Sequence, residues 1–210
     1  MIKNESGIEI IIDKGDYIGE GSYGRVYRLD RDTCYKEFLI TPESNNLSNL
    51  KKLKSWSHIP SLYTIKDLCF DRDRFCGYTM QYYESVPVST LSKRYIYENY
   101  LKLVELIKKI SDERYFLVDL HSGNMIMTKD GIVLIDCDDM DQARRDCTKE
   151  LIFRMNLDNL GDSIGYYISS YALKNRLDLV RADEMYRALS NGDIDSFNTD
   201  EPLFKTYRCY

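Results

Sequence analysis

The sequence lacks the paired cysteines and histidines that identify zinc knuckles and dithiol redox motifs. Its six cysteines are scattered without a C-x-x-C pair, and the chain has only two histidines. Zinc sites and redox dithiols need such residues at close, regular spacing. We therefore expect reduced thiols, as in a cytoplasmic protein.

Segments that would enter or cross a membrane are also missing. The first residues, Met1 to Glu5, form no apolar signal core, and no apolar run reaches the length of a membrane span. Cys209 lies too near the end of the sequence for a prenylation box. We expect a cytoplasmic protein with no membrane span, although delivery by a specialised secretion system would leave no recognisable pattern.

An excess of positive charge is absent as well. The formal net charge is −5, and nucleic acids are bound chiefly by lysine and arginine, so we expect no nucleic-acid partner. With 43% hydrophobic and 30% charged residues, the composition is that of a folded globular protein. A chain of 210 residues suffices for one compact domain or for two small lobes that share a cleft.

The first part of the chain, residues 1–84, is predicted to be rich in strands. Apolar and alternating runs predict five antiparallel strands, at residues 8–12, 26–29, 34–40, 62–70 and 75–83. One helix is predicted to begin with Thr41 as N-cap and Pro42 in the first turn, and to end near Trp56.

The second part, residues 85–210, is predicted to be mostly helical, and the boundary lies near Pro87. Residues 97–110 are apolar enough to predict a buried helix, and later helices are expected at 157–171 and 177–189, the last ended by Asn191-Gly192. Residues 125–127 and 132–135 predict a β-hairpin. The fold class is therefore α+β.

A glycine-spaced turn begins soon after Tyr17. Gly19, Gly21 and Gly24 match G-x-G-x-x-G, with Ser22 inside the turn and Val26 two residues after the last glycine. Without side chains, backbone amides can approach phosphate oxygens closely. Dinucleotide-binding folds need a helix at this point, whereas a strand follows here, which favours a hairpin lid over nucleotide phosphates. An ordinary glycine-rich turn explains the motif when it is taken alone.

Lys36 lies twelve residues after Gly24, on the next predicted strand. A lysine there could reach the α- and β-phosphates of a nucleotide, and the alternative is a solvated lysine on an edge strand. Glu43, the one glutamate between Glu37 and Glu84, is the candidate to orient this lysine. Its alternative role is to interact favourably with the dipole of the helix that follows.

Three polar residues surround the predicted hairpin of the second part. Asp119 and Asn124 are five residues apart, and Asp136 follows twelve residues later, after an apolar strand. One carboxylate can orient or deprotonate an attacking hydroxyl, while an amide and a second carboxylate can ligate Mg²⁺. Each residue alone could be a loop cap, but the set, together with the glycines and the lysine, favours phosphoryl transfer. A calcium-binding loop that starts at Asp136 is excluded, because such a loop needs glycine at the position that Asp141 occupies.

From Tyr17 to about Asp139 the chain resembles the protein-kinase-like superfamily, as a small and atypical member of the bacterial or phage type. The resemblance implies one kinase-like domain with two lobes, a five-stranded sheet with one helix over residues 1–84 and a reduced helical lobe over residues 85–210. It implies ATP and Mg²⁺ as cofactors. The residue roles that it implies are Asp119 as catalytic base, Asn124 and Asp136 as metal ligands, Lys36 as phosphate lysine, and Met80 to Tyr83 as the hinge, with backbone groups of Gln81 and Tyr83 bonded to adenine.

Several positions depart from the pattern of protein kinases. Leu117-Val118-Asp119 stands for His-Arg-Asp, so the arginine that would read a phosphorylated activation loop is missing. Asp136-Cys137-Asp138 stands for Asp-Phe-Gly, no Ala-Pro-Glu follows, and only 74 residues (210 − 136) come after Asp136. We expect a reduced substrate platform and no regulation through that arginine.

The loop after Asp119 resembles a second group of kinases. His121 gives it the form Asp-x-His-x-x-Asn, which is similar to aminoglycoside and choline phosphotransferases. His121 could contact the γ-phosphate or form a hydrogen bond within the loop. Residues 158–165 resemble the helix whose aspartate braces the catalytic loop, with Asp158 and Asp162 as unassigned candidates.

The expected function is therefore ATP- and Mg²⁺-dependent transfer of a phosphoryl group to a hydroxyl, most simply by a minimal protein serine/threonine kinase. The first alternative is a phosphotransferase that acts on a small hydroxylated metabolite or antibiotic. The second is a nucleotide-binding pseudokinase that serves as an interaction module. Retention of Lys36, Asp119, Asn124 and Asp136 argues against the pseudokinase.

Overall fold

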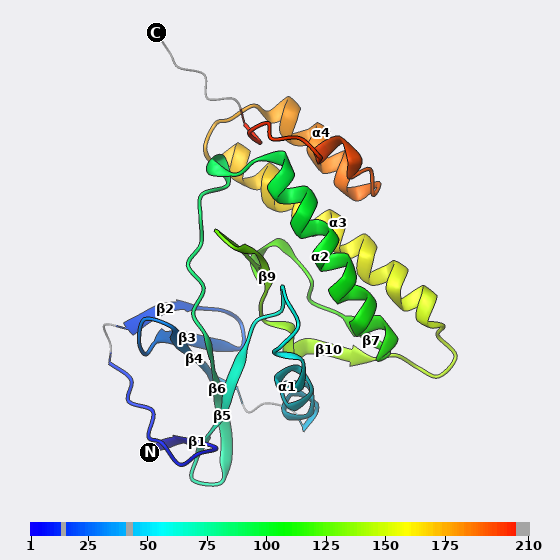
Figure 1. The fold of residues 1–210 in the computed structure, drawn as a ribbon. Coiled ribbons are helices and arrows are strands. Elements are labelled where there is room, and N and C mark those ends of the chain that lie inside the picture. Colours follow the sequence, from blue (N-terminus) through cyan, green and yellow to red (C-terminus); the bar gives the residue numbers. More distant parts are fainter. Residues whose placement is uncertain (14–15, 41–43, 205–210) are drawn as a thin grey trace. The chain divides into compact units, whose positions relative to one another are not determined.

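The computed structural model of the protein describes residues 1–13, 16–40 and 44–204 (Figure 1). Within these residues the fold is α+β, with four α-helices and a six-stranded antiparallel sheet. The chain divides into two compact units, Met1–Glu84 and Ser85–Tyr210. None of the helices in the described residues combines the length and the apolar character that a membrane crossing requires.

The first unit contains the antiparallel sheet and one helix. Its strands are β1 (Ile2–Asn4), β2 (Tyr17–Glu20), β3 (Gly24–Arg28), β4 (Thr33–Phe38), β5 (Ile65–Asp71) and β6 (Arg74–Gln81), and its helix is α1 (Ser44–Trp56). The order of strands across the sheet is β1-β5-β6-β4-β3-β2. The chain thus forms two groups of neighbouring hairpins, and β6 joins them by pairing with both β4 and β5.

The sheet has six strands rather than the five predicted, and the predicted strand at residues 8–12 is wrong. The edge strand next to β5 is β1, while Ile8 and Ile11 are 63% and 78% exposed. Gly7 adopts a positive φ of 79°, and the Asn4 side chain accepts hydrogen bonds from the amides of Ser6 and Ile8. This local turn reverses the chain before the apolar run, so that the run leaves the sheet after one isolated bridge.

The core of the first unit lies between the sheet and α1. The helix buries Leu50, Leu53 and Trp56, whose three-residue spacing places them on one face. They pack against β5, where Leu68 is fully buried. Each such side chain stabilises the fold by about 1.5–3 kcal/mol relative to an exposed position. The predicted helix start at residues 41–43 lies outside the described residues.

The second unit is mostly helical. Its elements are η2 (Val88–Thr90), α2 (Lys93–Asp112), β7 (Tyr115–Leu117), η3 (Ser122–Asn124), β8 (Met125–Thr128), β9 (Gly131–Leu134), η4 (Cys137–Asp139), β10 (Met140–Gln142), α3 (Lys149–Lys174), α4 (Leu179–Ser190) and η5 (Asp195–Phe197). The segment between α2 and α3 forms two short antiparallel ladders, β8-β9 and β7-β10. The β8-β9 ladder is the hairpin predicted from residues 125–135.

Helix α2, predicted over residues 97–110 as a buried helix, is buried along one face. Leu103, Ile107 and Ile110 are inaccessible and recur at helical spacing, whereas Leu101 is 43% exposed on the other side. Ser92 caps the helix by accepting a hydrogen bond from the amide of Tyr95. The positions of the apolar residues around the helix therefore determine which of them reach the core.

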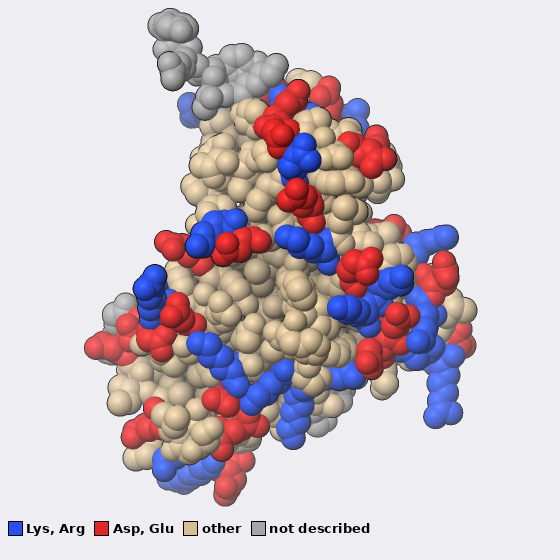
Figure 2. All heavy atoms as spheres, in the orientation of Figure 1, with Lys and Arg blue, Asp and Glu red and all other residues tan. Residues whose placement is uncertain are grey.

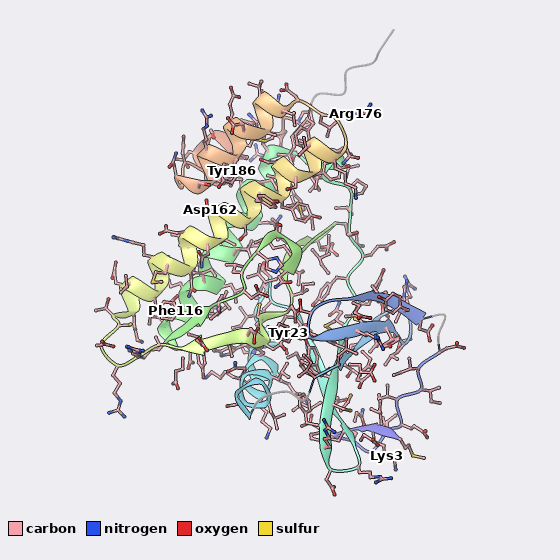
Figure 3. The ribbon with its side chains drawn as sticks, turned by 180° about the vertical axis from the view of Figure 1, so that it is seen from behind. Lys3, Tyr23, Phe116, Asp162, Arg176 and Tyr186 are labelled. Atoms are coloured by element: carbon pink, nitrogen blue, oxygen red, sulfur yellow. The ribbon has the colours of Figure 1, made fainter. Side chains whose placement is uncertain are left out.

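Helix α3 begins eight residues earlier and ends three residues later than the segment predicted at 157–171. Thr148 is its N-cap, accepting a hydrogen bond from the amide of Leu151. The helix packs closely on α4 at Gly161, where an added Cβ would lie only 2.5 Å from the Leu189 carbonyl oxygen. Figure 3 shows Asp162 on α3 and Tyr186 on α4 directed toward each other across this contact.

Candidate functional site

The glycine-spaced turn forms the β2-β3 hairpin of the first unit. Gly19 pairs with Val26, and the amide of Gly21 donates a hydrogen bond of 2.9 Å to the carbonyl oxygen of Gly24. A strand therefore follows the motif, as the sequence predicted, and no helix begins there. Ser22 and Tyr23 lie exposed at the tip of the hairpin.

The three glycines of the hairpin differ in their surroundings. A Cβ added at Gly19 or Gly21 would meet nothing within 4 Å, and neither residue has a positive φ. At Gly24 a Cβ would lie 2.6 Å from the Glu37 carbonyl oxygen and 3.2 Å from Cε of Lys36. Gly24 is thus required by the packing of β3 on β4. Gly19 and Gly21 are not explained by contacts within the described chain, and they leave the backbone open to a ligand.

Lys36 lies on the central strand β4, and its neighbours bury its hydrocarbon stem. It pairs with Val26 on β3 and with Tyr78 on β6, and only 7% of its surface is exposed. Its Nζ lies 5.4 Å from the centre of the Phe38 ring and 5.8 Å from that of Tyr78. The alternative of a solvated lysine on an edge strand is therefore excluded. Glu43, the predicted partner of this lysine, lies outside the described residues.

The predicted hinge follows the last strand of the sheet. Met80 is nearly buried, Gln81 is exposed, and the Tyr83 hydroxyl accepts a hydrogen bond of 3.1 Å from the amide of Thr64. The Gln81 amide already donates to the Thr64 carbonyl oxygen at 2.9 Å. Its carbonyl oxygen accepts a weak 3.7 Å contact from the Cys34 thiol, so the carbonyl oxygen, rather than the amide, is the Gln81 group for which a bond to adenine is predicted.

In the second unit, Asp119, Asn124 and Asp136 line the same small pocket, together with Asp139. The Asn124 amide nitrogen donates to the Asp119 carbonyl oxygen at 2.9 Å and to its carboxylate at 3.2 Å. The Ile135 amide donates to the Asn124 carbonyl oxygen, which ties the loop to the strand that precedes Asp136. Three residues separated by up to seventeen positions thus converge at one end of the β8-β9 hairpin.

The pocket around these residues is suited to an ion or a single water molecule rather than to a nucleotide. Its volume is about 10 Å³, close to the lower limit for one water molecule. In side-chain hydrogen bonds among the described residues, Asn124 uses only its Nδ2, so its side-chain oxygen Oδ1 remains available as a ligand. Amide and carboxylate oxygens are the ligands that Mg²⁺ prefers, and the residues present therefore fit this ion.

The described residues form no metal cage made of protein side chains alone. Within the ranges that the structure describes, no group of three or more His, Cys, Asp or Glu residues is placed to hold a metal. Mg²⁺ usually binds through one or two protein groups, with water and substrate phosphates as the other ligands. The pair Asn124 and Asp136 corresponds to that incomplete type of site.

Asp136 adopts a backbone conformation that is uncommon for a residue with a side chain. Its φ of 56° and ψ of 40° place it in the left-handed region at the N-terminal boundary of η4. Residues other than glycine in this region cost energy, and they concentrate at functional sites where the surrounding structure holds them. Here the conformation turns the chain between β9 and η4, at the residue predicted to ligate the metal.

His121 forms a hydrogen bond within its own loop. Its Nδ1 accepts from the Gly123 amide at 2.9 Å, and its Nε2 lies 3.5 Å from the Asp119 carboxylate. Because Nδ1 accepts, the proton of the neutral ring is assigned to Nε2, the nitrogen that faces Asp119. A Cβ at Gly123 would lie 2.8 Å from the imidazole ring, so glycine is required for this contact. Both His121 and Asp119 remain about half exposed.

Two side chains of α3 hold the Asp119 loop, and no pattern in the sequence singles out either of them. Asn156 accepts from the Leu117 amide at 2.9 Å and donates to the Tyr115 carbonyl oxygen at 3.0 Å. Ser163 donates to the Leu120 carbonyl oxygen at 2.9 Å. The bracing role was expected from an aspartate in residues 158–165. Asp162 instead accepts hydrogen bonds from α4, and Asp158 is exposed.

A much larger cavity lies elsewhere in the second unit. It measures about 520 Å³ and is bounded by α4 and η5, with Lys93, Arg181, Met185 and Phe197 among its walls. It contains none of the residues that the sequence pattern singled out, and Glu201 lies within 3.4 Å of both cationic groups. On the face drawn in Figure 2, positive and negative side chains are likewise interspersed.

No family model matches the chain, and no curated protein sequence matches it.

Proposed function

We propose that the protein is an ATP- and Mg²⁺-dependent phosphotransferase with a protein-kinase-like arrangement of two lobes, and that it acts as a minimal serine/threonine kinase. The observation that carries this proposal is the convergence of Asp119, Asn124 and Asp136 on one ion-sized pocket. A general base beside two oxygen ligands is the set of groups that phosphoryl transfer to a hydroxyl requires.

In the proposed reaction the acceptor hydroxyl attacks the γ-phosphorus of ATP. A bond forms between the acceptor oxygen and phosphorus, the bond to the oxygen that bridges the β- and γ-phosphates breaks, and ADP leaves. The hydroxyl proton passes to the Asp119 carboxylate, whose half-exposed position lets an acceptor reach it. Bound Mg²⁺ would neutralise part of the charge on the phosphates. Asn124 and Asp136 would hold it.

The first unit supplies groups that can bind the rest of the nucleotide. The space beside Gly19 and Gly21 lets phosphate oxygens approach the backbone of the turn that contains Ser22, while the Gly21 amide itself donates to the Gly24 carbonyl oxygen. Lys36 carries the positive charge for the α- and β-phosphates. The Gln81 carbonyl oxygen and the Tyr83 backbone are the groups proposed to bond adenine, beside Met80 and Val26.

The test is transfer of labelled phosphate from ATP, with Mg²⁺, to generic serine, threonine and tyrosine peptides and to the protein itself. We expect transfer by the full chain and its loss in Asp136→Ala. The matched control is Asp141→Ala, which removes an exposed carboxylate on β10 outside the pocket. Mass spectrometry of the phosphorylated residues reports the preference among hydroxyl acceptors.

Two results would contradict the proposal. Transfer that is indifferent to Asp136→Ala would show that this carboxylate is not a metal ligand. Absence of transfer combined with a thermal shift on adding Mg·ATP would instead support the pseudokinase, which binds nucleotide without chemistry.

A second candidate is a phosphotransferase for a small molecule that carries an ammonium group. The specific observation in its favour is that Asp139 lines the same pocket as Asp119, which makes the surroundings of the proposed base acidic. The Asp-x-His-x-x-Asn form of the loop favours it as well. A screen of hydroxylated amines for ATP consumption separates the two candidates, because a protein kinase would ignore such compounds.

A further inference from the structure

Helix α3 forms hydrogen bonds with the loop that carries Asp119, both before and after that residue in the sequence. Before Asp119, the Asn156 side chain bonds the amide of Leu117 and the carbonyl oxygen of Tyr115. After it, the Ser163 hydroxyl shares its one proton between the carbonyl oxygen of Leu120 at 2.9 Å and that of Asn159 in α3 at 2.6 Å. The two holding residues are seven apart, which is two turns of helix, and therefore lie on the same face of α3.

Both holding residues are deeply buried, unlike the carboxylate that they position. Asn156 is 1% exposed and Ser163 is 6% exposed, whereas the Asp119 side chain is about half exposed. The Asn156 amide nitrogen also donates to the Ser111 hydroxyl of α2 at 3.1 Å. Buried polar groups with all their partners in place restrict a structure to one arrangement, because any displacement leaves a group unsatisfied. The loop backbone is thus tied to two helices.

We infer that Asn156 and Ser163 are positioning residues that keep the Asp119 carboxylate at a fixed place relative to Asn124 and Asp136. This inference rests on the proposed function. Neither residue touches a reacting atom; they act through the backbone of residues 115–120. A displacement of about 1 Å in a reacting group can cost on the order of a hundredfold in rate, so loss of these bonds should slow the chemical step.

The test compares Ser163→Ala, Ser163→Thr and Asn156→Ala in the full chain. We expect kcat to fall about tenfold in Ser163→Ala and more in Asn156→Ala, while KM for ATP changes less than about twofold. Ser163→Thr keeps a hydroxyl and is expected to stay within about threefold of the parent. Asn156→Ala also removes a buried hydrogen bond from each of two backbone groups, and Ser163→Ala therefore provides the result if that variant unfolds.

A second readout needs neither nucleotide nor activity. Hydrogen exchange of the amides of Leu117, Gly123 and Asn124, measured without ligand, is expected to speed up about tenfold in Ser163→Ala and Asn156→Ala. The control is Gly161→Ala, which crowds α4 without a contact to the loop and lowers the melting temperature. It is expected to leave kcat and the exchange of these amides unchanged at temperatures well below melting.

The outcomes separate this inference from the proposed function. A parent protein that transfers no phosphate overturns the proposed function, and the exchange data then decide alone whether Asn156 and Ser163 hold the loop. If Ser163→Ala keeps the parent kcat and exchange rates, the inference is wrong. It is also wrong if kcat falls simply because the melting temperature falls. Gly161→Ala would reveal this by losing kcat although it has no contact with the loop.

Discussion

The two units hold their candidate functional groups in opposite ways. In the first unit the relevant feature is an absence of side chains, since a Cβ placed at Gly19 or Gly21 would have no neighbour within 4 Å. In the second unit the relevant groups are side chains. The loop that carries Asp119 forms hydrogen bonds with Asn156 and Ser163. Binding of a flexible phosphate chain needs an accessible backbone, whereas proton transfer needs a carboxylate fixed in place.

This difference explains why the two units should respond differently to substitution. A side chain added to the hairpin has room in the free protein and acts only when a ligand approaches. A bond removed from the loop of the second unit takes a partner from a buried polar group, and so acts on the free protein as well. Substitutions in each unit test this contrast, and the effects are expected to decrease from the proposed base to the buried thiols.

Replacement of the proposed base should have the largest effect. Asp119→Asn keeps the size of the side chain and an oxygen that can accept the hydrogen bond from Asn124, but it removes the negative charge. We expect kcat to fall about 10²- to 10⁴-fold, because that is the usual contribution of general acid–base catalysis. Single-turnover transfer measures the loss. Thermal shift with Mg·ATP should show that nucleotide binding is retained, and an unchanged kcat would remove Asp119 from the role of base.

The glycines of the hairpin should separate ligand binding from folding. Gly21→Ala is expected to raise KM for ATP about tenfold with no change in melting temperature, because its Cβ meets only open space until phosphate approaches. Gly24→Ala is expected to lower the free energy of unfolding by about 1–3 kcal/mol, since its Cβ would overlap the Glu37 carbonyl oxygen. Titration of the transfer rate with ATP and chemical denaturation measure the two effects.

An ordinary turn would give a different result at Gly21. If KM for ATP stays at the parent value in both Gly21→Ala and Gly19→Ala, the hairpin does not approach phosphate, and the comparison between the units loses its first half.

The smallest effect concerns two buried thiols of the first unit. Burial raises the pKa of Cys34 to about 11 and that of Cys69 to about 12, from an ordinary value of 9.0. Their contribution to stability is complete below pH 9, where both states keep the proton. It is lost as the pH rises above 9, because the unfolded thiols ionise first. We expect each thiol to cost about 1 kcal/mol of unfolding free energy at pH 10.

Denaturation of the protein between pH 8 and pH 10 measures this loss, and Cys69→Ala should reduce the slope. The same slope in Cys69→Ala and in the parent would mean that other groups cause the pH dependence. Reaction with a thiol reagent offers a further check, because protonated buried thiols should react slowly at pH 8.

Patterns that are local in the sequence predicted the structure well. The glycine spacing and the strand that follows it indicated the β2-β3 hairpin, and Lys36 lies on the next strand with its stem beside Gly24. The β8-β9 hairpin was also predicted, with the three polar residues at its end. Turn residues and alternating apolar positions determine such elements within about ten residues, without reference to the rest of the chain.

Predictions that relied on apolar content alone were less accurate. The run at residues 8–12 was expected to form a strand, yet the turn at Gly7 leaves it outside the sheet, and Ile2–Asn4 forms the edge strand next to β5 instead. Helix α3 extends well before residue 157, where its capping residue Thr148 and the buried Ile152 were not recognised. A short apolar run is compatible with either a strand or a helix, and the surface against which it packs decides between them.

The sequence by itself determined the identity and the order of the candidate functional residues, because glycine sterics, strand alternation and turn chemistry act between near neighbours. Only the tertiary structure decided that Asp139 joins the pocket and that Asn156 and Ser163, rather than an aspartate, hold the Asp119 loop. These bonds join residues 39 and 43 positions apart. Whether such groups meet depends on how α3 packs on α2 and on the β7 loop, and no local pattern encodes that packing.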